Sequence, residues 1–301
     1  MYERILVPLD GSEVAEVALP CAEELAGRLG SEIILMHVGE SADSLRRMEP
    51  YIQKILEATR KGAERYPIKS GVKPLKIESV IAVGHPAEEI VDYAEKENIG
   101  LIIMATHGRS GIRRWALGSV ADKVIRATKR PVALIRAEGV RPDIRERGIL
   151  NKVLVSLDGS KQSETILPYI EELASTLKTE VVLLHVLSPS HYIYAAEGGA
   201  VKVKYTEAEI KQLETNAEDY LNKVAGGLKK KGITAKLEVA VGNEAEKIIT
   251  MADEIGADIV AMSTHGRSGL GRLVLGSVAD RILHEGKTPL LLVRAAPRQD
   301  I

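Results

Sequence analysis

Residues 5–12 read Ile-Leu-Val-Pro-Leu-Asp-Gly-Ser, and the pattern returns at residues 153–160 as Val-Leu-Val-Ser-Leu-Asp-Gly-Ser. A second segment, residues 106–122, returns at residues 264–280 with 13 of 17 positions identical. Matches of this length in the same order indicate one domain written twice in tandem.

The repeat sets the expected domain boundaries. We expect a first domain at residues 1–138, a linker at residues 139–150 and a second domain at residues 151–301. The linker contains Pro, Gly and many charges, without a sustained apolar period. The second copy also carries ten extra residues before Gly242, because the spacing of matching segments grows from 148 to 158 residues. These extra residues could form a lid over its pocket.

Short apolar runs alternate with segments of helical periodicity inside each copy. In the first copy we expect strands at residues 4–9, 32–38, 75–83, 101–105 and 131–136, and helices at residues 13–29, 44–66, 86–98 and 118–129. The second copy predicts the same order of elements. This alternation is typical of a doubly wound, Rossmann-like α/β domain, a five-stranded parallel sheet flanked by helices. Such sheets bind ligands at the carboxyl ends of their strands.

Composition excludes several classes of protein. The net charge of −1 supplies no field that would attract nucleic acid or anionic lipid. No apolar run approaches the roughly 20 residues that span a membrane. The single cysteine, Cys21, rules out an intrachain disulfide and fits a reducing compartment. Because the chain also begins directly with a strand pattern and no signal peptide, we expect a cytoplasmic protein without nucleic-acid or membrane partners.

The loop after the expected fourth strand contains the residues that favour binding of an anionic ligand. It spans residues 106–119 and ends at a helix N-terminus, where backbone N–H groups and the helix dipole favour an anion. Gly108 and Gly118 let the backbone approach a ligand closely, Arg109 adds positive charge, and Ser119 adds a hydroxyl that can cap the helix. The second copy repeats these residues as Gly266, Gly276, Arg267 and Ser277. An ordinary strand-to-helix connection with turn glycines is the alternative interpretation.

Together these motifs make the whole chain resemble a tandem universal stress protein. The resemblance rests on the starts of both copies, on Val-Gly-x-x-Ala-Glu-x-Ile at residues 83–90 and 241–248, and on the two long loops. The family implies strand order 3-2-1-4-5 and pairing of fifth strands between subunits. We therefore expect the two copies to pair through their fifth strands as a pseudo-dimer within one chain. A further homodimer is left open.

The ATP-binding branch of that family has Gly, two residues, Gly, nine residues, then Gly-Ser or Gly-Thr. Here Ala105 and Ser263 replace the first glycine. If that position needs a positive φ, alanine would be strained there. The resemblance implies ATP or another adenine nucleotide as the ligand, with Mg²⁺ carried by the nucleotide as an option. No cluster has metal-ligand spacing, so we expect no dedicated metal site.

The resemblance also implies which residues hold the nucleotide. Asp10 and Asp158 would face the ribose or the adenine, although Asp-Gly is also a favoured turn pair. Val38 and Val186 would line the base pocket. The complete expected set is Pro8, Asp10, Val38, Ala105, His107, Gly108, Arg109, Gly118, Ser119, Val120, Asp158, Val186, Ser263, His265, Gly266, Arg267, Gly276, Ser277 and Val278.

The expected function is nucleotide binding in stress response or signalling, with at most slow ATP hydrolysis. The sequence indicates no residue as a general base for an attacking water, and it contains no nucleophile-elbow motif. His107 and His265 lie beside the phosphate loop, where we favour a loop-positioning hydrogen bond over a phosphate contact. Two alternatives stay open: an interaction module that has lost its ligand, which Ala105 and Ser263 motivate, and a nucleotide hydrolase or transferase. We expect the two sites to differ in affinity.

Overall fold

The computed structural model describes residues 1–66, 75–108, 117–136, 150–194, 200–264 and 275–294. The first half contributes five strands to the main sheet: β1 (Arg4–Pro8), β2 (Glu32–Gly39), β3 (Ile77–Val83), β4 (Leu101–Ala105) and β5 (Val132–Ile135). The second half contributes β6 (Lys152–Ser156), β7 (Glu180–Leu187), β10 (Ala235–Val241), β11 (Ile259–Ser263) and β12 (Leu290–Val293).

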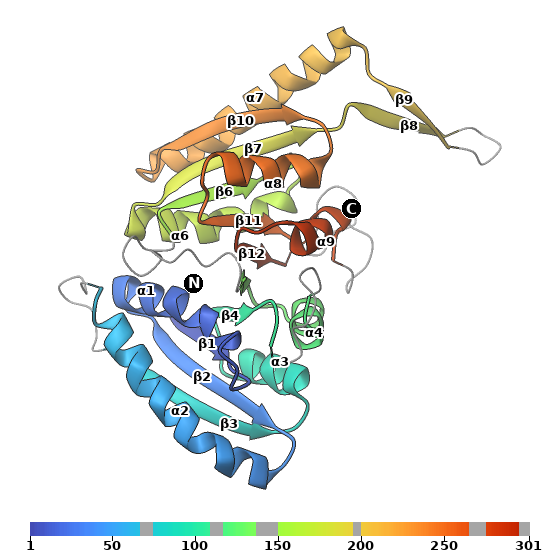
Figure 1. The fold of residues 1–301 in the computed structure, drawn as a ribbon. Helices are drawn as coiled ribbons and strands as arrows, with labels where there is room; N and C mark the ends of the chain where they lie inside the picture. The colour runs from blue at the N-terminus through green and yellow to red at the C-terminus, as the bar shows by residue number, and fades with distance from the viewer. Residues whose placement is uncertain (67–74, 109–116, 137–149, 195–199, 265–274, 295–301) are drawn as a thin grey trace.

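These ten strands form one sheet in the order β10-β7-β6-β11-β12-β5-β4-β1-β2-β3 (Figure 1). Within this sheet, all pairings inside each half are parallel, and each half has the expected strand order 3-2-1-4-5. The order reverses between β1 and β4, and between β6 and β11. A crevice at the carboxyl ends of these strands is where doubly wound folds bind ligands.

The two halves join through their fifth strands. β5 and β12 pair antiparallel, with Leu134 opposite Leu290 and Val132 opposite Leu292. All four side chains are buried, so the sheet runs from one half into the other without an exposed edge. This is the fifth-strand pairing expected within one chain.

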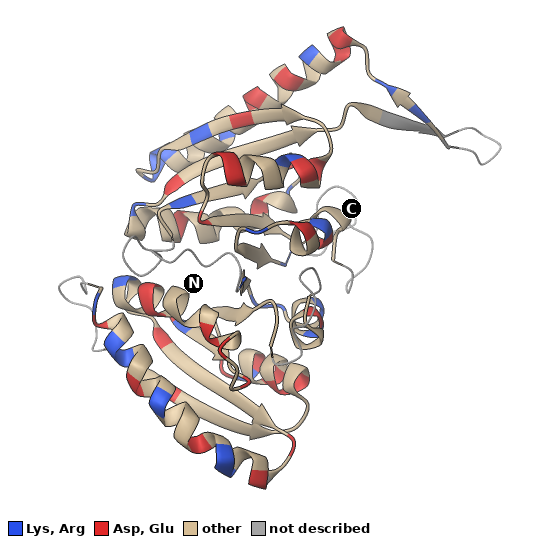
Figure 2. Ribbon diagram, viewed as in Figure 1, with Lys and Arg blue, Asp and Glu red and all other residues tan. Residues whose placement is uncertain are grey.

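Helices cover both faces of the sheet. One face carries α1 (Leu19–Leu29), α2 (Ala42–Ala63), α6 (Leu167–Leu177) and α7 (Glu207–Lys230). The other carries α3 (Pro86–Lys96), α4 (Ser119–Ala127), α8 (Glu244–Glu254) and α9 (Ser277–Glu285). Alternate strand residues face alternate layers: Ile5 and Val7 belong to the first core, and Leu6 to the second. Charged residues lie mainly along the helices, as on α2 and α7 in Figure 2.

The helix expected at residues 13–29 begins differently from the prediction. A 3₁₀ turn, η1 (Ala15–Ala18), precedes α1, and η3 (Ser163–Ile166) precedes α6 in the same way. Pro20 has no N–H to continue an α-helical ladder, so the α-helix starts afresh beside it. The predicted stop is confirmed, since Gly30 ends α1 in the left-handed conformation with φ 75°.

The prediction of identical elements in both copies is wrong in one place. The second copy contains an additional antiparallel hairpin, β8 (Ser190–Tyr194) and β9 (Ala200–Lys204). Its described strands extend away from the main sheet in Figure 1, so they do not form the lid considered from the sequence. Within the described ranges, no helix is both long and apolar enough to cross a membrane.

Candidate functional site

Each half has a pocket at the carboxyl ends of its strands. The first pocket, in the N-terminal half, has a volume of about 220 Å³, and the second pocket, in the C-terminal half, has a volume of about 420 Å³. Small-molecule sites usually occupy about 300–1,000 Å³. The second pocket falls within that range, whereas the first is a smaller cleft.

The structure gathers the described residues of the expected set around these two pockets. The first pocket is lined by Pro8, Asp10, Val38, Ala105, His107, Gly108, Gly118, Ser119 and Val120. The second pocket is lined by Asp158, Val186, Ser263, Gly276, Ser277 and Val278. The remaining members, Arg109, His265, Gly266 and Arg267, lie outside the described residues.

One end of each pocket is a helix N-terminus. Gly118 is the N-cap of α4 and Gly276 the N-cap of α9, and neither has a side chain that caps its helix. The sequence suggested that Ser119 could cap this helix, but Ser119 is the first residue of α4 and Gly118 is the cap. The geometry of an α-helix leaves the first-turn N–H groups without intrahelical acceptors, so they can donate to an anion in the pocket.

A backbone bridge fixes where these helices begin. The N–H of Gly118 donates to the carbonyl of Thr106 at 2.7 Å, and the N–H of Gly276 donates to Thr264 at 2.9 Å. A Cβ on Gly118 would lie 3.0 Å from that Thr106 oxygen, closer than most real Cβ contacts. Glycine at this position lets the end of the strand and the start of the helix meet around the anion site.

The replaced glycines of the motif are compatible with the fold. Ala105 is the last residue of β4 and pairs with Ile135, and Ser263 ends β11 opposite Val293. Neither has a positive φ, since Asn98 and Lys178 are the only non-glycine residues with that conformation in the described ranges. The strain considered for Ala105 is therefore absent, and the replacement does not distort the pocket wall.

Asp10 organises the loop that forms the opposite wall of the first pocket. Its Oδ1 accepts hydrogen bonds from the Ser12 N–H at 2.9 Å and the Ser12 hydroxyl at 2.6 Å. Asp158 holds Ser160 with the same two bonds, at 2.9 and 2.6 Å. The turn role considered for these aspartates is thus real, and it leaves each carboxylate lining a pocket.

The loop after β4 passes directly over Asp10. A Cβ built on Gly108 would collide with the Asp10 carboxylate, so any larger residue here would force that carboxylate to shift. Next to it, the hydroxyl of Thr106 and Nδ1 of His107 are 2.9 Å apart. This contact agrees with the loop-positioning role favoured for His107.

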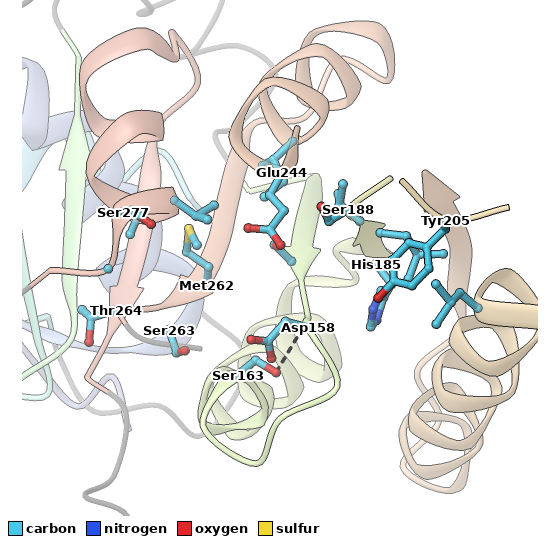
Figure 3. Close-up of a pocket in the computed structure, with 18 residues that line it drawn as sticks. Asp158, Ser163, His185, Ser188, Tyr205, Glu244, Met262, Ser263, Thr264 and Ser277 are labelled. Atoms are coloured by element: carbon cyan, nitrogen blue, oxygen red, sulfur yellow. Dashed lines mark hydrogen bonds between the residues drawn. The ribbon is translucent and has the colours of Figure 1, made fainter. Parts of the chain in front are cut away.

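Further residues line the pockets that the sequence did not single out for this role. In the first pocket these are Leu9, Ala15, Met36, Pro86, Ile90, Met104, Thr106 and Ala121. In the second pocket they are Ser156, Ser163, His185, Leu187, Ser188, Tyr205, Leu213, Glu244, Ile248, Met262, Thr264 and Ala279 (Figure 3). Many could have been found by placing the two copies of the sequence side by side, because they occupy equivalent positions.

His185 connects the second pocket to α7. Its ring packs edge-to-face on the Tyr220 ring, with centroids 5.8 Å apart and an interplanar angle of 76°. Burial, and secondly the charge of Glu164, raise the pKa of the Tyr220 hydroxyl. The phenol therefore stays neutral beside His185, which lines the pocket.

The described residues contain no group of three or more His, Cys, Asp or Glu side chains that could hold a metal ion. The pockets supply instead backbone N–H groups at one end, hydroxyls, and one carboxylate on the strand-one loop of each half.

Comparison with known proteins gives one family. A model of the universal stress protein family matches residues 1–136 and 150–294. Universal stress protein MJ0577 of Methanocaldococcus jannaschii is 30% identical over 155 residues, which cover 45% of this chain and 96% of that protein. Universal stress protein Slr1230 of Synechocystis is 24% identical over 319 residues, which cover 97% of this chain and 100% of that protein.

The fold has full-length counterparts among solved structures. A universal stress protein from Archaeoglobus fulgidus covers 98% of this chain and 100% of its own, with a TM-score of 0.67 and 20% sequence identity. This likeness shows that the same tandem architecture occurs in another chain of the family.

Proposed function

This chain belongs to the universal stress protein family, and from that premise we propose that it is a cytoplasmic stress-response or signalling protein that binds an adenine nucleotide. The observation that carries the proposal is the pocket at each strand reversal, between an aspartate loop and a glycine-capped helix N-terminus. Phosphate groups are favoured ligands of such helix ends.

The residues present fit a nucleotide in one orientation. The phosphates would accept hydrogen bonds from the first-turn N–H groups of α4 or α9 and from the hydroxyl of Ser119 or Ser277. The ribose hydroxyls would donate to Asp10 or Asp158. The base would lie against Val38 or Val186, at the carboxyl end of the second strand of each half.

The same geometry favours binding over turnover. In the described part of the pockets, His107 contacts Thr106, and Asp10 and Asp158 accept hydrogen bonds from serines of their own loops, so we assign none of these groups as the base for an attacking water. Any Mg²⁺ would be held mainly by the phosphates of the nucleotide. We therefore propose at most slow ATP hydrolysis.

The test is to identify what the purified protein holds and what stabilises it. Mass spectrometry of the denatured protein is expected to release an adenine nucleotide. Calorimetric titration with ATP, AMP and cyclic AMP is expected to give saturable binding, and the same ligands should raise the melting temperature. Absence of a released nucleotide, together with no binding of any of the three, would overturn the proposal.

Matched variants locate the binding. Gly118→Val and Gly276→Val place side chains at the two anion sites, and the double variant is expected to abolish nucleotide binding while circular dichroism stays unchanged. Gly227→Val is the control, because a Cβ on Gly227 in α7 would meet no atom within 4 Å. Full nucleotide binding in the folded double variant would exclude these pockets.

A further inference from the structure

The two pockets share one plan but differ in chemistry. At four equivalent positions the first pocket has an apolar residue and the second has a polar one. The first pocket has Pro8, Ala15, Pro86 and Ala105, and the second has Ser156, Ser163, Glu244 and Ser263. All four changes run in the same direction, so at these positions the second pocket offers more hydrogen-bonding groups to its ligand.

Glu244 is the strongest of these differences because it adds a charge. Pro86 is the first residue of α3 and Glu244 is the first residue of α8, so the two side chains start from equivalent backbone positions. In Figure 3 the Glu244 carboxylate points into the second pocket, toward the side that carries Asp158. Among the described residues, two carboxylates therefore line the second pocket, whereas Asp10 is the one carboxylate lining the first.

The second pocket also has additional lining residues on one side. Ser188 and Tyr205, at the base of the β8–β9 hairpin, and Leu213 of α7 line it beyond Val186. The described lining of the first pocket, about 220 Å³ against about 420 Å³ for the second, includes no equivalent of these three residues. In Figure 3, Ser188 and Tyr205 lie on the side of the pocket away from Ser277 and the helix N-terminus.

A carboxylate in such a pocket acts on a ligand in two ways. It repels each added negative charge of a polyphosphate, an effect that water and salt weaken but do not remove at contact range. It also accepts hydrogen bonds from the N–H and O–H groups that a nucleoside supplies. The proline side chain at the equivalent position has no acceptor for these groups. Both effects favour a ligand with few phosphates.

We propose that the second pocket selects a less anionic ligand than the first, a nucleoside or nucleoside monophosphate in preference to a triphosphate, and that Glu244 sets this preference. The inference rests on the proposed function, because it presupposes that both pockets bind nucleotides. It assigns different ligands to the two halves of the chain.

The experiment exchanges the two residues. Full-length protein is titrated calorimetrically with ATP, AMP and adenosine, in a Gly118→Val background to isolate the second pocket and a Gly276→Val background to isolate the first. The ratio of Kd for ATP to Kd for AMP is expected to be about tenfold higher in the second pocket. Glu244→Pro should lower this ratio in the second pocket, and Pro86→Glu should raise it in the first.

Both exchanges place residues that the first helical position accepts. Proline is well tolerated there, and glutamate already occupies the equivalent position of α8. Glu244→Gln keeps the shape and removes the charge, so it should act in the same direction as Glu244→Pro on ATP. The exchanges are also made in the otherwise unchanged chain, with the ATP and AMP thermal shifts compared, so that the conclusion does not depend on the valine variants folding.

Equal ATP-to-AMP ratios in the two pockets, unaltered by either exchange, would overturn this inference and leave nucleotide binding intact. A ratio that changes with Glu244→Pro but not with Glu244→Gln would overturn the role of the charge. If neither pocket binds ATP, AMP or adenosine, the proposed function fails and this inference fails with it.

Discussion

Arg136, which follows β5, donates a hydrogen bond at 3.1 Å to the carbonyl oxygen of Ile282 in α9, in the other half of the chain. The same guanidinium also bonds the carbonyl of Leu283. Arg294 mirrors it by donating to the carbonyl of Thr128 at the end of α4, at 3.0 Å. Each half thus supplies a cation to the carboxyl end of the other half's pocket helix.

We expect Arg136→Ala and Arg294→Ala each to lower the free energy of unfolding by about 1–2 kcal/mol, because each leaves helix-end carbonyls without a charged donor. Urea denaturation measures this loss. Lys123→Ala, an exposed change on α4, is the control and should have little effect. Wild-type stability in both arginine variants would show that these bonds do not hold the halves together.

Because Gly108 lies close to Asp10, the effects of substitutions at these two positions on the free energy of unfolding should not be additive. Gly108→Ala should destabilise the protein by about 1 kcal/mol, because the new Cβ displaces a carboxylate that Ser12 anchors. In an Asp10→Ala background the same change should cost much less. A double-mutant cycle of unfolding free energies tests this coupling, and strictly additive values would contradict it.

Substituting Gly118 with progressively larger residues should weaken nucleotide binding in the first pocket step by step. Gly118→Ala should weaken nucleotide binding slightly, since its Cβ would lie 3.0 Å from the Thr106 oxygen. Gly118→Val adds methyl groups at the anion site and should abolish binding there. Calorimetric titration in a Gly276→Val background measures both, and equal affinities along the series would argue against phosphate binding at this helix.

Glu32 predicts a pH dependence of stability. Burial alone would raise the pKa of its carboxyl, but hydrogen bonds from Lys76 at 2.6 Å and Arg4 at 3.1 Å outweigh it and lower that pKa below 4.5. A carboxyl with a lowered folded-state pKa stabilises the protein above the unfolded-state pKa, and this stabilisation disappears as the pH falls through the folded-state value.

Glu32→Gln should therefore lower the free energy of unfolding at neutral pH by at most about 1 kcal/mol and make no difference in strongly acidic buffer. Urea denaturation across that range measures the difference. Glu88→Gln, at an exposed position of α3, serves as the control. A constant difference at all pH values would show that Glu32 acts through packing and not through its charge.

Cys21 should be chemically silent in the folded protein. Its side chain is buried in α1, and burial, with a smaller effect of Glu24, raises the pKa of the thiol. The thiolate is the reactive form, so a thiol-specific reagent at neutral pH should label one cysteine only after denaturation. Rapid labelling of the native protein would show that the helix opens locally.

The sequence predicted the main sheet well because each strand is a short apolar run bounded by turn residues. The fifth-strand pairing was expected from the family resemblance, and the apolar runs that begin at Val132 and Leu290 agree with it because a lone domain would expose them. It missed the hairpin because the ten added residues have no counterpart in the first copy. Alternation of Val and Lys at residues 201–204 was the available signal for β9.

The site was predictable where motif residues carry it, as for Asp10, Gly118 and Ser119. Residues such as Ala15 and Tyr205 reach the pockets only through the packing of helices on the sheet, which sequence spacing does not specify. Glu244 stood in the sequence at an equivalent position to Pro86, but its direction into the pocket depends on where α8 begins.

The antiparallel pairing of β5 with β12 also has an evolutionary consequence. In a symmetric dimer of identical chains, every substitution appears in both binding sites at once, so the sites cannot specialise separately. Joining the two copies in one polypeptide removes that constraint, because a mutation in one half leaves the other unchanged. The difference between Pro86 and Glu244 is one that a dimer of identical chains cannot accumulate.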